Sequence, residues 1–305
     1  KEHGPYLFFL NQPFLNNKGQ TALPAYSYNT LWRLDSRDNS VNLVINDITN
    51  RSHEKTPPYA ILDDRIIYFS FEGLFSVDFF GLNKIKLNSF RHSRIDNFGN
   101  QMASYDGYVY FPLIDNENVN RGLWRSNGTV EGTTKVELCE ENVCYHSPRK
   151  FVASNDKLFL IADSSEKGTR IWSISNNKAS IISSATTELN AYDIFISPSG
   201  IQFNVADKIW FSDGTNEGTY PIAPAALDSI GFGDSIIVTT PQDISIIEDK
   251  GKGTKTILSS GLHFINTNLI VLNNKIYYVG AHHLVDVDIA TDTSSEIFNF
   301  EGHAP

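Results

Sequence analysis

Two stretches of the sequence decide the fold: LWRSNGTVEGT at residues 123–133 and IWFSDGTNEGT at residues 209–219. Both begin with an apolar residue and a tryptophan, and both continue into a turn of Gly, Thr and Asn or Asp. Trp124 and Trp210 lie 86 positions apart, which is twice 43. Repetition at a period in the forties, with several short strands in each unit, is typical of β-propeller blades.

Weaker copies of the same unit occur along the rest of the chain. Each copy reads as an apolar segment, a tight polar turn, a second strand, the tryptophan-type strand and a short fourth strand. The alternation of apolar and polar residues has period two, which is the strand signal, and dipeptides such as Asp-Gly and Asn-Asn suit tight hairpins. The residue at the tryptophan position recurs at intervals of 37 to 49 residues: Trp32, Phe75, Trp124, Trp172, Trp210, Ile247 and Val285.

The sequence therefore predicts an all-β fold, a single β-propeller domain over residues 1–305 with about seven four-stranded blades. The first blade is unusual because KEHGPYLFFL resembles a second strand. Either the C-terminal segment FNFEGHAP completes it, so that pairing of the chain ends closes the ring, or the blade has three strands. The predicted blades are approximately 1–48, 57–90, 98–139, 148–184, 190–223, 227–259 and 266–300.

Charge and hydropathy exclude two classes of partner. The formal net charge is −10, from 25 Lys and Arg against 35 Asp and Glu. Nucleic-acid binding depends on clustered basic residues that neutralise phosphates, and the sequence has no basic stripe, so we expect no nucleic-acid partner. No run of 18 apolar residues occurs, so we expect no membrane span in this piece, although the full product could carry an anchor. We also expect no cofactor.

The two cysteines, Cys139 and Cys144, lie five positions apart in CEENVC. Such a pair can close a small disulfide ring, which fits an oxidising compartment. The alternative is two unpaired thiols. A metal site built on the pair would need further ligands.

The motif LWRSNGTVEGT and its copy IWFSDGTNEGT resemble the ELWxSDGTxxGT repeats of bacterial secreted and cell-surface propeller-like proteins. Two copies match well and five are eroded. The resemblance implies a β architecture and an extracytoplasmic location: periplasmic, cell-surface or secreted. It carries no catalytic residue across, because that repeat family has no common chemistry.

The long loops and the histidines point to one face of such a ring. The long connections fall between strand four of one blade and strand one of the next, or between strands two and three, and all belong to blades one to four. Long loops on a rigid scaffold are where recognition usually lies. The residues we predict for a binding site in these two loop sets are His53, Arg91, His92, Arg94, Tyr145, His146, His263, His282 and His283.

Three interpretations of the histidines compete. WD-repeat propellers place a histidine in this same connection to brace each blade, so the role can be structural. The histidines can instead line a polar ligand pocket at the central opening of the ring. They can also converge on a metal ion, since imidazole suits Zn, Cu, Fe or Ni, but no HxH or HExxH spacing supports this and we predict no metal ligands.

The sequence favours a non-catalytic recognition domain that binds a protein, peptide or glycan through the long-loop face of blades one to four. One form of this hypothesis is the sensor ectodomain of a membrane-anchored regulator. A histidine-rich face could make its binding change between about pH 5 and 7. The alternative is a propeller enzyme, a metal-dependent lyase or a glycoside hydrolase with a His-lined central pocket. A third class is a scaffold that acts by its surface alone.

Overall fold

The structure is a computed structural model of the 305-residue chain. It is all-β: the described residues form thirty strands and no helix, so they include no helix that could cross a membrane. The residues that the structure describes are 2–11, 28–49, 59–70, 72–89, 102–114, 121–154, 156–182, 194–197, 199–205, 208–224, 228–232, 235–239, 243–248, 253–259, 269–273, 275–279, 283–291 and 293–299.

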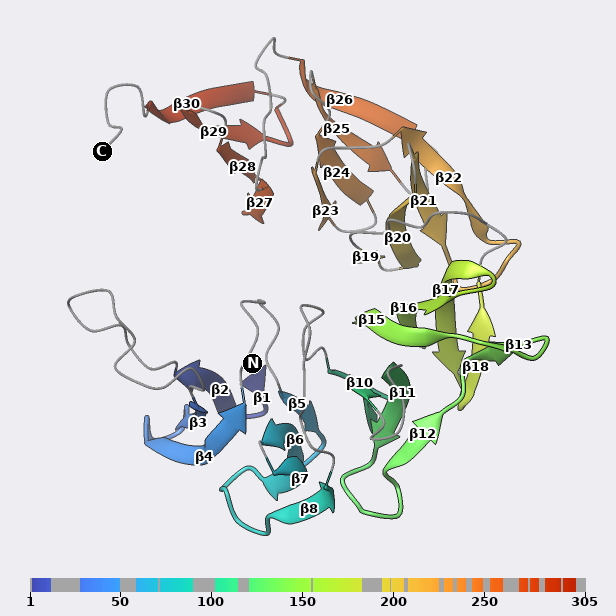
Figure 1. The fold of residues 1–305 in the computed structure, drawn as a ribbon. Helices are drawn as coiled ribbons and strands as arrows, with labels where there is room; N and C mark the ends of the chain where they lie inside the picture. The colour runs from blue at the N-terminus through green and yellow to red at the C-terminus, as the bar shows by residue number, and fades with distance from the viewer. Residues whose placement is uncertain are drawn as a thin grey trace, which may run out of the picture. The chain divides into compact units, whose positions relative to one another are not determined.

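Twenty-eight of the strands build seven antiparallel sheets of four strands, and within each sheet the strands neighbour one another in chain order (Figure 1). The first three sheets are β1 (Glu2–His3), β2 (Tyr6–Asn11), β3 (Tyr28–Asp35), β4 (Val41–Thr49); β5 (Tyr59–Leu62), β6 (Arg65–Ser70), β7 (Gly73–Asp78), β8 (Ile85–Asn88); and β9 (Ala103–Tyr105), β10 (Tyr108–Ile114), β11 (Arg121–Ser126), β12 (Thr134–Val136). A separate two-stranded hairpin follows, β13 (Cys139–Glu140) and β14 (Val143–Cys144).

The remaining four sheets repeat the plan. They are β15 (His146–Ala153), β16 (Leu158–Ser164), β17 (Gly168–Ser175), β18 (Lys178–Ile181); β19 (Ile194–Ser197), β20 (Gly200–Val205), β21 (Lys208–Ser212), β22 (Thr219–Pro224); β23 (Asp228–Phe232), β24 (Ser235–Thr239), β25 (Asp243–Glu248), β26 (Gly253–Ser259); and β27 (Leu269–Leu272), β28 (Lys275–Val279), β29 (His283–Asp288), β30 (Thr293–Asn299).

The chain divides into two compact units, one of residues 1–167 with 174–180 and one of residues 168–173 with 181–305. The first three sheets and the β13–β14 hairpin lie in the first unit, and the last three sheets lie in the second. The strands of the fourth sheet are shared between them. Whether the seven sheets form the blades of one closed ring stays a prediction.

Within the first unit, the second sheet is buried on both faces. Ile66 and Tyr68 of β6 belong to a core cluster with Phe8 and Leu31 of the first sheet. Their neighbours in β6 face the other way, and Ile67 joins a cluster with residues of the third sheet, against which Trp124 packs. This explains why β6 reads as a continuous apolar run, since alternate residues enter different cores.

The second unit is built in the same way. Ile209 of β21 packs with Ile236 and Ile247 of the sixth sheet. The other face of the sixth sheet contributes Ile237 to a cluster with Tyr278 of the last sheet. Each inner sheet of a unit is therefore held by apolar burial on two sides.

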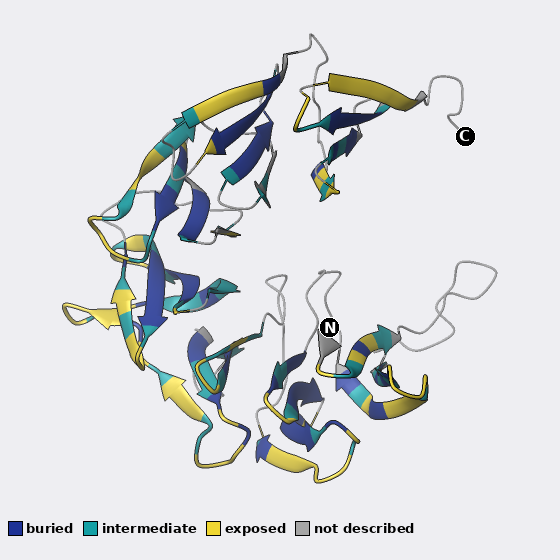
Figure 2. Ribbon diagram, turned by 180° about the vertical axis from the view of Figure 1, so that it is seen from behind, coloured by how far each residue is buried: buried dark blue, intermediate teal, exposed yellow. Residues whose placement is uncertain are grey.

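The first and last sheets of the chain each contain apolar residues that are exposed (Figure 2). On the first sheet, Phe9 pairs with Trp32 and Trp32 with Leu43, so these side chains form a row opposite the buried Phe8. Phe9 is 39% exposed and Leu43 is 44% exposed. On the last sheet, Ile270 is 59% exposed and Leu272 is 56% exposed.

The two turns that carry the repeat motif have the same hydrogen bonds. In the first, the Ser126 hydroxyl accepts from the Gly128 N–H at 3.1 Å and lies 2.8 Å from the Thr133 hydroxyl. The Asn127 side chain accepts from the Thr129 N–H at 3.1 Å. A Cβ on Gly132 would lie 1.8 Å from Asn127 Oδ1, so glycine is required there.

The second turn repeats this arrangement atom for atom, with Asp213 in place of the asparagine. Ser212 accepts from the Gly214 N–H at 3.0 Å, and Asp213 accepts from the Thr215 N–H at 2.9 Å. Gly128 and Gly214 have φ angles of 86° and 91°, in the region that favours glycine. The motif is thus a self-contained turn, and its Asp and Asn are structural.

The first sheet corrects a prediction. We expected the C-terminal segment to complete it, or a sheet of three strands. Instead β1 supplies the missing strand, with Glu2 paired to Leu7 and His3 to Tyr6. Phe298 and Asn299 belong to β30 and pair within the last sheet. Among the described residues, the chain ends do not share a sheet, because the N-terminal segment turns back on β2 and occupies the edge itself.

Candidate functional site

The structure describes four of the predicted site residues in full: Cys139, Cys144, Tyr145 and His146. They lie together, in the β13–β14 hairpin and at the start of β15. His283 begins β29, and its side chain is not described. Six predicted residues lie outside the described part of the chain: His53, Arg91, His92, Arg94, His263 and His282.

The predicted disulfide between Cys139 and Cys144 is confirmed. The two residues are direct partners across the hairpin, with Cα atoms 4.1 Å apart. The turn between the strands holds Glu141 and Asn142 at positive φ angles of 49° and 69°, the geometry of a two-residue hairpin turn. At the base, the Tyr145 N–H donates to the Leu138 carbonyl at 2.8 Å.

The hairpin is exposed and projects from the neighbouring strands of its unit (Figure 2). Lys167, at the end of the loop after β16, donates a 2.8 Å hydrogen bond to the Glu141 carboxylate at the tip. This bond lowers the pKa of Glu141 and raises the pKa of Lys167, because each charge stabilises the other. The disulfide, the base hydrogen bond and this ion pair restrain the hairpin at three points.

The strand after the hairpin, β15, is irregular. Its pairing with β16 shifts register between His146 and Arg149 and again between Arg149 and Val152. Ser147 and Lys150, one in each shift, have φ angles of 53° and 57°. Bulges and positive φ at residues other than glycine are unfavourable unless surrounding contacts hold them, and they occur often beside functional sites.

One consequence of the first bulge is a charged cluster on β15 and β16. His146 lies opposite Asp163 in the strand register. Arg149 reaches the same carboxylate with both terminal nitrogens, and the Nη2–Oδ1 distance is 3.0 Å. Tyr145, beside His146, is buried, with only 3% of its surface exposed. The Arg149–Asp163 ion pair therefore lies next to the His146 position in the strand register, at the foot of the hairpin.

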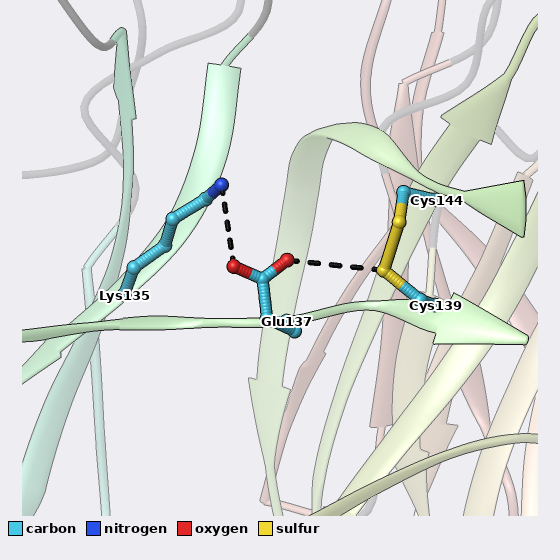
Figure 3. The surroundings of a disulfide bond; sticks show 4 residues. All are labelled: Lys135, Glu137, Cys139 and Cys144. Carbon is cyan, nitrogen blue, oxygen red and sulfur yellow. Dashed lines mark hydrogen bonds and ion pairs between the residues drawn. A yellow bond between two sulfur atoms is a disulfide. The ribbon is translucent and has the colours of Figure 1, made fainter. Parts of the chain in front are cut away.

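The carboxylate of Glu137 approaches the disulfide (Figure 3). Glu137 Oε2 lies 3.8 Å from Cys139 Sγ, and its other oxygen lies 3.3 Å from Lys135 Nζ. Glu137 lies in the short connection between β12 and β13, so its carboxylate lies between the side chains of Lys135 and Cys139.

Sequence reasoning missed Glu137, Arg149, Asp163 and Lys167. No strand periodicity marks Glu137, because it lies in the connection between β12 and β13. The Arg149–Asp163 pair could have been suspected from the hairpin centred on residues 154–157, but the two bulges displace the register that a regular hairpin predicts.

Comparison with known proteins supports the fold. No protein-family model matches the chain, and no curated protein matches it in sequence. Among solved structures, it is similar to dipeptidyl peptidase 4 of Porphyromonas gingivalis, with a TM-score of 0.63 and 7% identity over 97% of this chain and 51% of that one. A prolyl endopeptidase gives a TM-score of 0.52 with 11% identity over 97% of this chain and 48% of that one.

The chain thus spans about half the length of both peptidases. A third similar structure is the Dos1 propeller, with a TM-score of 0.51 and 13% identity over 90% of this chain and 80% of that one. At such low identity the likeness concerns the fold alone. The chain has a β-propeller-like, all-β fold.

Proposed function

We propose that this chain is a non-catalytic recognition domain that binds a protein, peptide or glycan through the connection from β12 to β15. One observation carries the proposal: residues 139–144 form a largely exposed hairpin that belongs to none of the seven four-stranded sheets. A disulfide and an ion pair hold it, whereas the repeat turns are held by their own side chains. Pre-organised loops on a rigid scaffold are suited to recognition.

The proposed contact residues are those of the hairpin tip and of the His146–Arg149–Asp163 cluster. The tip offers backbone groups and Asn142, and the cluster offers an imidazole with donor and acceptor atoms. The other predicted residues, including His92 and Arg94, remain proposed members of the same long-loop face.

The arrangement of the seven sheets in one ring is also proposed. We infer that the seven sheets are blades of one ring. The likeness to the Dos1 propeller supports it. A compact chain of 305 residues should have a radius of gyration of about 19 Å, which small-angle X-ray scattering would measure. A clearly larger radius would contradict a closed ring.

An extracytoplasmic location is also proposed. The disulfide is consistent with an oxidising compartment, and the SxGTxxGT turns resemble repeats of bacterial secreted and cell-surface proteins. A sensor ectodomain of a membrane-anchored regulator would fit such a location.

Binding to glycan and random-peptide arrays tests the function. For the ligand that the array selects, we expect His146→Ala to raise the dissociation constant at least tenfold. Glu217→Ala, on the exposed part of the second repeat turn, is the matched control and should change it less than twofold. Failure to bind any probe, or equal affinity of the wild type and the His146 variant, would contradict the proposal.

The likeness to two peptidases favours a second candidate, a substrate-recruiting part of a larger peptidase-like protein. The chain matches about half of each, so it would not carry the whole activity. A purified chain that cleaves chromogenic prolyl dipeptides, with a rate that scales with its concentration, would overturn the non-catalytic proposal. Binding of the same peptides without cleavage would favour the recruiting role.

A further inference from the structure

Three side chains that can bind a metal converge on the hairpin, outside the proposed contact residues. The ligand atoms of Glu137, Cys139 and Cys144 all lie within 4.8 Å of one another, and all three residues are exposed. Figure 3 shows the Glu137 carboxylate directed at the disulfide from the connection between β12 and β13. In this form the two sulfur atoms are bonded to each other and cannot act as thiolate ligands.

We propose that reduction of the Cys139–Cys144 disulfide converts this cluster into a binding site for Zn²⁺, with Glu137 as the third protein ligand. A dithiol reductant would supply two electrons and two protons, becoming a disulfide itself, and leave two thiols on the hairpin. Binding of Zn²⁺ would then release the two thiol protons to solvent, because the thiolate is the ligand.

The geometry is close to what zinc requires. Zn–S and Zn–O bonds of about 2.0–2.3 Å in a tetrahedral site place ligand atoms roughly 3.3–3.8 Å apart. Glu137 Oε2 and Cys139 Sγ are already 3.8 Å apart. The two sulfur atoms must separate, and their exposure leaves room for the side chains to rotate. Three protein ligands would leave the fourth position to water, as in open zinc sites.

The hairpin is held by contacts that do not depend on the disulfide. Glu140 still pairs with Val143, the Tyr145 N–H still donates to Leu138, and Lys167 still holds Glu141. The two thiols would therefore stay opposite each other after reduction. A site whose ligands are already positioned loses less free energy to ordering when the metal binds.

One nearby charge opposes the metal. Lys135 Nζ lies 3.3 Å from Glu137 Oε1, and its positive charge would repel Zn²⁺ and compete for the carboxylate. Glu140 provides the contrast, because it follows Cys139 directly and a strand directs successive side chains to opposite faces. Glu137 and Glu140 are both exposed, but only Glu137 belongs to the cluster.

The test is a Zn²⁺ titration of the 305-residue chain against a chromophoric chelator, after reduction with a phosphine and after oxidation. We expect one Zn²⁺ per reduced chain and none per oxidised chain. Glu137→Gln should weaken the reduced site at least tenfold, whereas Glu140→Gln should change it less than twofold. Lys135→Met should tighten it severalfold, and Cys144→Ser should abolish it.

A second measurement uses Co²⁺ in place of Zn²⁺, since thiolate ligation produces a charge-transfer absorption that a carboxylate site lacks. Circular dichroism checks that each variant keeps the β spectrum of the wild type. Equal metal binding by oxidised and reduced chains, or an equal loss of metal affinity in Glu137→Gln and Glu140→Gln, would overturn the proposal. So would a reduced wild type that binds no metal. None of these outcomes depends on the ligand arrays.

Discussion

The two repeat turns and the segment from β13 to β15 are built on opposite plans. Residues 126–133 and 212–219 have the same side-chain hydrogen bonds, although they lie in different units of the chain. Residues 139–153 have two register shifts and a disulfide, and Glu141, Asn142, Ser147 and Lys150 all have positive φ. The comparison indicates that repeated residues build the scaffold, and residues 139–153, which depart from the repeat, are where we propose that the binding function lies.

The largest expected effect concerns the scaffold. Ser126→Ala and Ser212→Ala each remove a buried hydroxyl that accepts from a glycine N–H and bonds a threonine hydroxyl. We expect each to lower the free energy of unfolding by about 2 kcal/mol, measured by urea denaturation. Ser165→Ala, at an exposed serine, is the control. A large loss in one turn and none in the other would break their equivalence.

Removal of the disulfide should have a smaller effect on stability. The ring it closes is short, and the hairpin retains its hydrogen bonds, so the double variant Cys139→Ala with Cys144→Ala should lose about 1–2 kcal/mol. The same urea denaturation measures it. A loss of unfolding free energy much larger than that of Ser126→Ala would show that the segment from β13 to β15 supports the scaffold, as the repeat turns do.

Acid titration tests a charged pair in the scaffold, Asp35 and Arg37 at the end of β3. Arg37 bonds the Asp35 carboxylate and lowers its pKa from 3.8 to about 2. A lowered folded-state pKa means that the contribution is present above pH 3.8 and is lost as the pH falls towards 2. Wild-type stability should therefore fall more steeply over this range than that of Asp35→Asn. Parallel curves would show that the Asp35–Arg37 pair has no part in the pH dependence.

The smallest expected effect comes from a substitution that tests whether the two repeat turns are structurally equivalent. Asn127→Asp gives the first turn the sequence of the second and keeps the oxygen that accepts from Thr129. We expect stability within about 0.5 kcal/mol of wild type, whereas Asn127→Ala should lose about 1 kcal/mol. Thermal unfolding of the two variants side by side measures the difference. Equal destabilisation by both would show that the side-chain oxygen is not what holds the turn.

Much of the fold could be predicted because it rests on local patterns. The repeat predicted the tryptophan-type strands and the glycine turns, and the spacing of the two cysteines predicted the disulfide, since each depends on residues close together in sequence. The first sheet could not be predicted correctly, because β1 has only two residues and no periodicity can be read from it.

The candidate site was only partly predictable. Tyr145 and His146 follow from their place in a long connection. Arg149, Asp163 and Lys167 take part through pairings 14 to 26 residues away. Pro148 lies in the first bulge and is the only glycine or proline that marks either one, because the second bulge, between Arg149 and Val152, contains neither residue. The histidines and arginines of the other long connections lie outside the described residues, so their place in the site stays a prediction.

The most direct test of the division between scaffold and site is hydrogen–deuterium exchange with and without the ligand that the arrays select. We predict slower exchange in residues 139–150 when that ligand is bound, with no change in the two repeat turns at 126–133 and 212–219. Protection confined to the repeat turns, or none across residues 139–150, would contradict the account.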